Sequence, residues 1–140
     1  MQAEEAFTQA NILDHLNPRP WGMITILCLT ASANGAPISR VAQANYCFRE
    51  ALRLGLKDEN ILEEAGDLYL EFDQKNATLC YSELVKAHPS NGQGWQKLGD
   101  ILGNSEGLTD SDRDRAIEAY KQAIDLLDGE GNKQKNALAL

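Results

Sequence analysis

The chain has 140 residues, of which 43% are hydrophobic, and its formal net charge is -8 at pH 7. This length allows one compact domain or a short array of repeats. The negative charge argues against a nucleic-acid-binding protein, because neutralising phosphates requires clustered Lys and Arg, and it disfavours adhesion to an anionic membrane. It favours basic partners through long-range attraction. The alternative is a solvated acidic surface with no preference for any partner.

The sequence contains no apolar segment long enough to cross a membrane. The best apolar run, residues 23–30, covers eight residues, whereas a spanning helix needs about 20. Glu4 and Glu5 lie where a signal peptide would carry positive charge, so we expect no signal peptide. These features predict a cytoplasmic protein that does not associate with membranes.

The cysteines and histidines form no metal-binding or disulfide pattern. Three cysteines is an odd number, they include no CxxC pair, and the two histidines are too isolated to complete a metal site with them. These residues are Cys28, Cys47, Cys80, His15 and His88. We therefore expect a reducing, intracellular setting, with no metal and no cofactor.

A short pattern of small and aromatic residues recurs along the chain. An Ala is followed four residues later by an aromatic residue, and three residues after that by Ala, or by Leu in one copy. The four copies cover residues 3–10, 44–51, 77–84 and 116–123. Residues four apart share one face of a helix, so each copy predicts a helix whose small residue admits a close neighbour.

A second pattern precedes three of these copies. The pattern begins with a large residue. After two further residues come an apolar residue and Gly, and after two more residues comes a second large residue. The pattern covers residues 62–69 and 95–102, and a degenerate copy covers residues 21–28, where Thr25 replaces Gly. Because Gly is a poor helix former, close packing of a neighbouring helix is the expected reason for its presence.

Together the two patterns resemble the tetratricopeptide repeat (TPR) family, whose unit has about 34 residues. The resemblance implies an all-α fold: an α-solenoid of antiparallel helix pairs that form a right-handed superhelix. It also implies a single TPR domain over residues 1–140. The expected segments are residues 1–17 (second helix of a truncated repeat), 18–58 (repeat with an insertion), 59–91 (repeat), 92–130 (repeat with an insertion) and 131–140 (tail).

Within the first full repeat, Pro18 and Pro20 are expected to break the chain before its first helix. Residues 24–30 are rich enough in β-branched side chains to form a buried strand. A lone strand among helices would have no pairing partner, so we predict a helix there.

Polar residues mark the ends of the later helices. Asp58 is expected to cap a helix over residues 59–72, and Asn91 one over 92–102 that ends at Gly103. The other expected limits are Asn76 before a helix stopped by Pro89, and Thr109 or Ser111 at the start of a last helix that Gly129 closes.

No residue pattern predicts catalysis. Cys47 and Cys80 precede aromatic residues at sites where other copies have Ala, which indicates small, buried positions rather than redox chemistry. Trp21 and Trp95 fill the large-residue position of the family, so core filling is expected. No phosphate-binding loop and no nucleophile-base pair is present in the sequence. The chain is therefore expected to be no enzyme.

In TPR arrays the first helix of each pair lines a concave groove. The residues here that face away from the packing patterns are Arg19, Ile26, Leu29, Asn60, Glu63, Asp67, Leu70, Gln93, Gln96 and Asp100. Chaperone-binding members of the family use Lys and Asn to hold a carboxylate, whereas Glu63 and Asp67 take the middle positions here. A basic or amphipathic helical segment is the expected partner. Solvated helix faces are the alternative, and so is end-to-end association through residues 3–16.

A narrower resemblance covers residues 13–22 (LDHLNPRPWG) and 44–72. These segments are similar to the C-terminal TPR region of a cilia- and flagella-associated protein of the axonemal central apparatus. The expected function is a non-catalytic protein-protein interaction or scaffold module, cytoplasmic or within a cilium or flagellum. Two alternatives stay open, namely a regulatory TPR domain of a larger enzyme and a co-chaperone-type adaptor.

Overall fold

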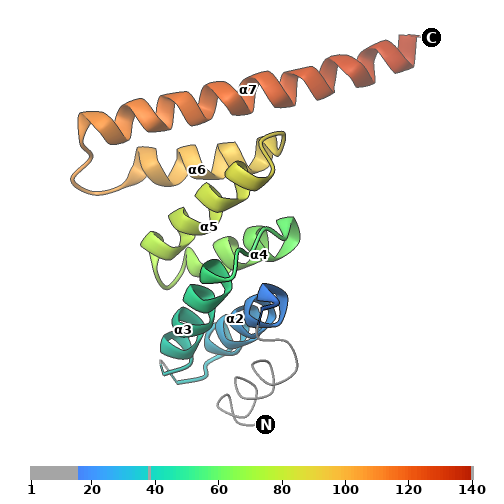
Figure 1. Cartoon of the computed structure of the whole chain (residues 1–140). Helices are drawn as coiled ribbons and strands as arrows, with labels where there is room; N and C mark the ends of the chain where they lie inside the picture. The colour runs from blue at the N-terminus through green and yellow to red at the C-terminus, as the bar shows by residue number, and fades with distance from the viewer. Residues whose placement is uncertain (1–15, 38, 140) are drawn as a thin grey trace. The chain divides into compact units, whose positions relative to one another are not determined.

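The computed structural model describes residues 16–37 and 39–139, with side chains up to residue 128. The described residues form six α-helices and no strand (Figure 1). The helices are α2 (Pro18–Ala33), α3 (Ser39–Arg53), α4 (Glu59–Tyr69), α5 (Gln74–Ala87), α6 (Gly92–Asn104) and α7 (Asp110–Ala139). The predicted all-α class is confirmed, and so is the helix over residues 24–30, which lies within α2.

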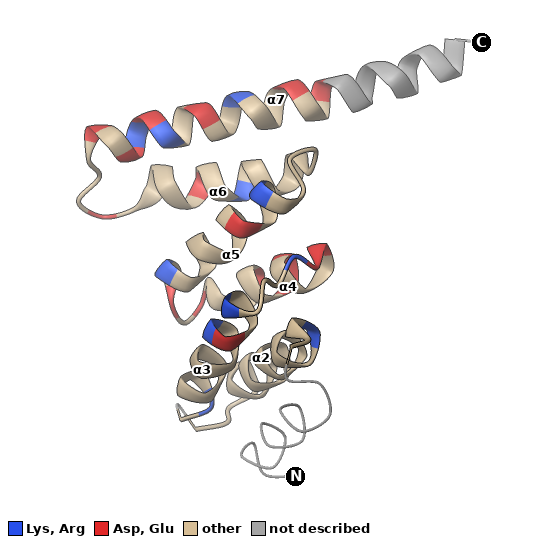
Figure 2. Ribbon diagram, viewed as in Figure 1, with Lys and Arg blue, Asp and Glu red and all other residues tan. Residues whose placement is uncertain are grey.

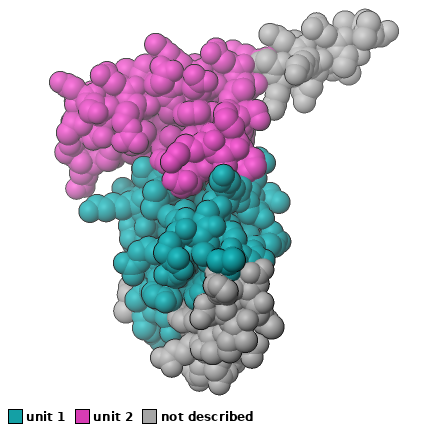
Figure 3. All heavy atoms as spheres, in the orientation of Figure 1, with its two compact units in different colours: residues 1–80 teal, residues 81–140 magenta. Residues whose placement is uncertain are grey.

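The chain divides into two compact units, residues 1–80 and 81–140, and the division falls inside α5 (Figure 3). The predicted repeat limits stay predictions. The expected truncated repeat at residues 1–17, its copy of the Ala-aromatic pattern at 3–10, and His15 lie outside the described residues, apart from Leu16 and Asn17.

In unit 1, α2 packs against both α3 and α4. Ala44 and Ala77, the small residues of two pattern copies, are fully buried. The rings of Phe48 and Tyr69 lie 5.5 Å apart between centroids, and Tyr69 is also fully buried. The side chains that the repeated patterns assigned to helix packing therefore do form the interior of this unit.

Thr25 shows how the degenerate pattern copy is accommodated. The residue is completely buried, where a hydroxyl without a partner would be costly. Its Oγ1 donates a hydrogen bond of 2.9 Å to the carbonyl oxygen of Trp21, one turn earlier. A Thr can therefore replace Gly at this position because the helix itself satisfies the side chain.

In unit 2, α6 and α7 lie side by side and are joined by residues 105–109 (Figure 1). Ala116 and Ala123 of the last pattern copy are buried. The aromatic residue between them, Tyr120, is 36% exposed and lies against Gly99. A Cβ atom on Gly99 would be 3.0 Å from the ring carbons of Tyr120, so the close approach predicted for this Gly is confirmed.

Three helix starts follow the predicted polar residues. Asp58 accepts a hydrogen bond from the backbone N–H of Ile61 at 3.4 Å, and Asn91 accepts one from Gly94 at 2.9 Å. Thr109 precedes α7 and exchanges bonds with Asp112 in a capping box: its Oγ1 accepts from the Asp112 N–H, and its own N–H donates to the Asp112 carboxylate.

Two other helix starts differ from prediction. α5 begins at Gln74, because Asp73 accepts bonds from the N–H groups of Lys75 and Asn76 and so caps the helix. Pro18 and Pro20 do not break the chain but lie in the first turn of α2. A helix tolerates Pro there, since the first N–H groups have no helical acceptor.

Three helix ends also differ from prediction. α4 stops at Tyr69 rather than residue 72, α6 passes Gly103 and ends at Asn104, and α7 passes Gly129 and ends at Ala139. The segment after Gly129 contains Lys, Gln, Ala and Leu, which are good helix formers. Gly129 and Gly131 each lower helix stability by only about 1 kcal/mol, so neither need end a helix.

Candidate functional site

The predicted residues of α4 share one surface hollow. Asn60, Glu63, Glu64 and Asp67 line a shallow hollow of about 350 Å³, which we call the α4 hollow. Their spacing of three, four and seven residues places them on one helix face. Three of the four were predicted, whereas Glu64 was not, although the same spacing includes it.

The α4 hollow is strongly acidic. The helix carries four acidic residues and no Lys or Arg (Figure 2). Three of the four carboxylates line the hollow. The chemistry of such a surface is attraction of cations, and a Lys or Arg side chain can approach it from solvent. All four lining residues come from one helix, so the hollow is an open feature of the surface rather than an enclosed cavity.

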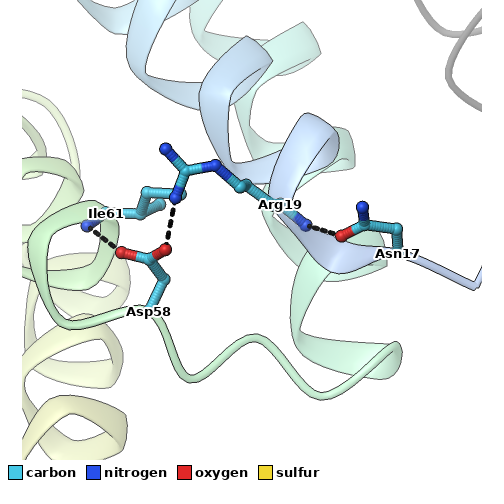
Figure 4. A network of polar contacts seen from close by, with 4 residues as sticks. All are labelled: Asn17, Arg19, Asp58 and Ile61. Atoms are coloured by element: carbon cyan, nitrogen blue, oxygen red, sulfur yellow. Dashed lines mark hydrogen bonds and ion pairs between the residues drawn. The ribbon is translucent and has the colours of Figure 1, made fainter.

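Arg19, a predicted groove residue, binds the start of α4. Its guanidinium forms an ion pair with the carboxylate of Asp58, the residue that caps α4 (Figure 4). The backbone N–H of Arg19 donates to the side chain of Asn17 at 3.0 Å, so the starts of α2 and α4 belong to one polar network. The Arg19 side chain is 61% exposed, and such an exposed pair contributes about 0–1 kcal/mol to stability.

Ile26 and Leu29 are a correction to the predicted groove. Leu29 is fully buried and Ile26 is 6% exposed, so neither side chain is available to a partner. The physical reason is that α2 packs on two helices, α3 and α4, and therefore buries a wider face than a helix with one neighbour. The exposed apolar residues of α2 are Met23 and Leu27, which the sequence reading missed.

The remaining predicted groove residues are exposed. Leu70 follows α4 and is 43% exposed. On α6, Gln93, Gln96 and Asp100 are exposed and lie three and seven residues apart, on one face of the helix. The sequence reading therefore identified the solvent-facing side of α4 and of α6, but not of α2.

Asp100 is engaged by the neighbouring helix. The hydroxyl of Tyr120 on α7 donates a hydrogen bond to its carboxylate. This bond, which requires the neutral phenol, raises the pKa of Tyr120 to about 12. A partner that approached Asp100 would have to compete with this hydroxyl.

The three cysteines lie in the interior of unit 1. Cys47 and Cys80 are fully buried and Cys28 is 5% exposed, which confirms their predicted burial. Burial raises the pKa of all three thiols. Neutral thiols are poor nucleophiles, so these residues are suited to packing. Among the described residues, no group of three His, Cys, Asp or Glu side chains could hold a metal ion.

No protein-family model and no curated protein matches the chain. Among the helices that the structure describes, none combines the length and the apolar composition that crossing a bilayer requires.

An apolar stripe on α7 is a further candidate surface. Ile117 and Ile124 are 52% and 57% exposed, and the partly exposed ring of Tyr120 lies between them along the helix. The spacing of three and seven residues places all three on one face. These three residues therefore form a partly exposed apolar stripe along α7.

Proposed function

We propose that the chain is a non-catalytic protein-interaction module built from TPR-like helix pairs, and that it binds a basic, amphipathic helical segment through the α4 hollow. The observation that carries the proposal is the set of three carboxylates on one face of α4, of which Glu64 and Asp67 are exposed and Glu63 is half-buried. Opposite charges at a contact surface raise the association rate and select the partner.

The repeated patterns support the TPR-like part of the proposal. Ala44, Ala77 and Ala116, which occupy equivalent positions in three copies, are all buried. Small buried residues at a fixed place in each repeat are what stacking of similar helix pairs requires. The similarity of residues 13–22 and 44–72 to an axonemal protein favours a scaffold in the cytoplasm of a cilium or flagellum as the setting.

A second binding mode that we propose is end-to-end association through the apolar stripe Ile117, Tyr120 and Ile124 on α7. No residue that the structure describes covers this stripe fully, and burying its apolar area against another surface would be favourable. Sedimentation at increasing protein concentration detects this mode, which does not involve the α4 hollow.

The proposal is tested by reversing charge in the α4 hollow. A synthetic Leu/Lys amphipathic helix of about five turns is a suitable probe, because it presents a cation on every turn of one face. The double variant Glu63→Lys with Asp67→Lys is expected to bind it at least about tenfold more weakly, since two attractions become repulsions. Isothermal calorimetry measures the affinity, and far-ultraviolet circular dichroism checks that helicity is unchanged.

The matched control is Glu106→Lys with Asp125→Lys. Both residues are exposed and lie outside the α4 hollow, and the pair changes the net charge by the same amount. Binding of the control at the affinity of the unmodified chain would localise the effect to the hollow. Equal weakening by both double variants would mean that the probe responds to net charge alone, and the proposed site would be rejected.

A further inference from the structure

Unit 2 contains a second hollow, of about 280 Å³, which we call the unit 2 hollow. Val85, Leu98, Leu102 and Ala119 line it, so its walls are mostly apolar and come from α5, α6 and α7. Trp95 forms part of the wall and is half-buried. Its indole N–H donates a hydrogen bond of 2.8 Å to the carbonyl oxygen of Pro89, which holds the ring in place.

The rim of this hollow carries charged residues, and one of them is available to a ligand. Lys86 pairs with Glu83 at 3.3 Å, and Glu118 accepts a hydrogen bond from Gln122 at 3.4 Å. Arg115 is exposed and forms no ion pair with any residue that the structure describes. Glu118 keeps its negative charge in this bond, because the amide of Gln122 is neutral. The positive group on the rim that forms no ion pair is the guanidinium of Arg115.

The size and lining of the hollow indicate what kind of group fits it. Pockets for small molecules measure about 300–1,000 Å³ and are largely enclosed, so this open hollow is better suited to one or two side chains. An apolar side chain gains from burial against four aliphatic walls. A carboxylate beside it can form two parallel hydrogen bonds with the planar guanidinium of Arg115.

We propose that the unit 2 hollow is a docking site for an acidic peptide segment, in which one bulky apolar side chain fills the hollow and a neighbouring carboxylate pairs with Arg115. The net charge of the chain opposes such a ligand at long range. That repulsion is screened over about 8 Å at physiological ionic strength. The carboxylate of Glu118 lies on the same rim, so the paired hydrogen bonds to Arg115 must outweigh its repulsion.

This site is independent of the function proposed for α4. It lies in unit 2, whereas the α4 hollow lies in unit 1, and the residues that line it were not among the predicted groove residues. The two ligands are also of opposite charge. Loss of one activity therefore does not imply loss of the other.

The structure provides a specific reporter for the test, because the chain contains two Trp residues and only Trp95 lines this hollow. In a ¹H–¹⁵N correlation spectrum, the two indole N–H groups give two separate signals, and a Trp95→Phe variant assigns them. The probe is the peptide acetyl-Ser-Glu-Phe-Glu-Ser-amide. We expect it to shift the Trp95 signal saturably and to leave the Trp21 signal in place.

Two changes define the interaction. Replacing Phe by Ala in the peptide is expected to abolish the shift, and Arg115→Gln is expected to weaken binding about fivefold, the upper end for an exposed ion pair. Arg113→Gln is the matched control, since Arg113 is on the same helix, 61% exposed, and pairs with Asp110 outside the hollow. Its affinity for the peptide is expected to be unchanged.

Several results would overturn the proposal. One is a Trp95 signal that does not respond to the peptide at millimolar concentration. Another is equal binding of the peptide with both Glu residues replaced by Lys, or equal weakening by the Arg113 and Arg115 variants. A Trp95 signal that shifts with protein concentration and not with peptide would assign the hollow to a second copy of the chain instead.

Discussion

The two hollows of this protein differ in chemistry although both are built on helices. The α4 hollow is lined by one amide and three carboxylates from a single helix. The unit 2 hollow is lined by four aliphatic side chains and Trp95 from three helices, with Arg115 and Glu118 at its rim. The first surface carries carboxylates alone as charged groups, whereas the second combines apolar walls with charges of both signs on its rim.

The difference explains why one hollow could be found in the sequence and the other could not. The four residues that line the α4 hollow lie within eight consecutive positions, so their helical spacing alone places them together. The unit 2 hollow collects residues from position 82 to position 119, and their proximity depends on how three helices pack. Local spacing therefore predicts a face, but a hollow between helices requires tertiary structure.

The largest expected effect is on the free energy of unfolding, when a buried Leu in the interior of each unit is replaced by Ala. Leu62 in unit 1 is fully buried, and Leu62→Ala should lower the free energy of unfolding by about 3 kcal/mol. Leu98 is 6% exposed and faces an existing hollow, so Leu98→Ala should cost less, about 2 kcal/mol. Urea denaturation followed by circular dichroism measures both. Equal costs would show that the hollow does not loosen the packing of unit 2.

A smaller effect on stability is expected when either of two glycines at helix contacts is replaced by Ala. A Cβ atom on Gly22 would lie 2.7 Å from Cγ2 of Ile61, which is buried, whereas one on Gly99 would lie 3.0 Å from the Tyr120 ring, which is partly exposed and can move. Ala gains about 1 kcal/mol in helix propensity at each site. After the cost of overpacking, we expect Gly22→Ala to destabilise by about 1 kcal/mol and Gly99→Ala to be nearly neutral.

The same denaturation experiment tests this contrast. If Gly99→Ala were the more damaging substitution, the ring of Tyr120 would be held more rigidly than its exposure indicates. Movement of that ring would also weaken its hydrogen bond to Asp100, so the Gly99 variant should show a lower Tyr120 pKa than the unmodified chain.

The smallest effect concerns the bond between Tyr120 and Asp100. The folded-state pKa of Tyr120 is about 12, above the ordinary value of 10.0, so the bond stabilises the fold fully below pH 10 and loses this contribution between pH 10 and 12. Asp100→Asn should return the pKa of Tyr120 toward 10. Ultraviolet titration of tyrosinate absorbance measures it, with Tyr120→Phe to identify the signal, and an unchanged titration curve would contradict the assignment.

Much of the fold could be predicted from residue spacing. The Ala-aromatic patterns predicted buried residues on α3, α5 and α7. Residues 24–30 were predicted to be helical because a lone strand would have no strand to pair with. The preference of helix starts for polar residues identified Asp58, Asn91 and Thr109 correctly as caps. It works because capping depends on side chains within three residues of the helix start. These are local rules, and they apply wherever no neighbouring helix changes the outcome.

The errors arose where distant residues decide the outcome. Ile26 and Leu29 are buried because α2 has two packing partners, which no spacing within α2 reveals. The ion pair of the exposed Arg19 with Asp58, 39 positions later, likewise has no signal in local spacing. Asp73 caps α5 where Asn76 was expected, since two candidate caps three residues apart cannot be separated by residue type alone.

The most direct test of the account exchanges probes and variants between the two hollows. The basic Leu/Lys helix and the acidic Phe-containing peptide are each titrated into Glu63→Lys/Asp67→Lys and into Arg115→Gln. We expect the first variant to lose affinity for the basic helix alone, and the second to lose affinity for the acidic peptide alone. Parallel changes for both probes in either variant, or no binding of either probe to the unmodified chain, would contradict the assignment of two separate docking surfaces.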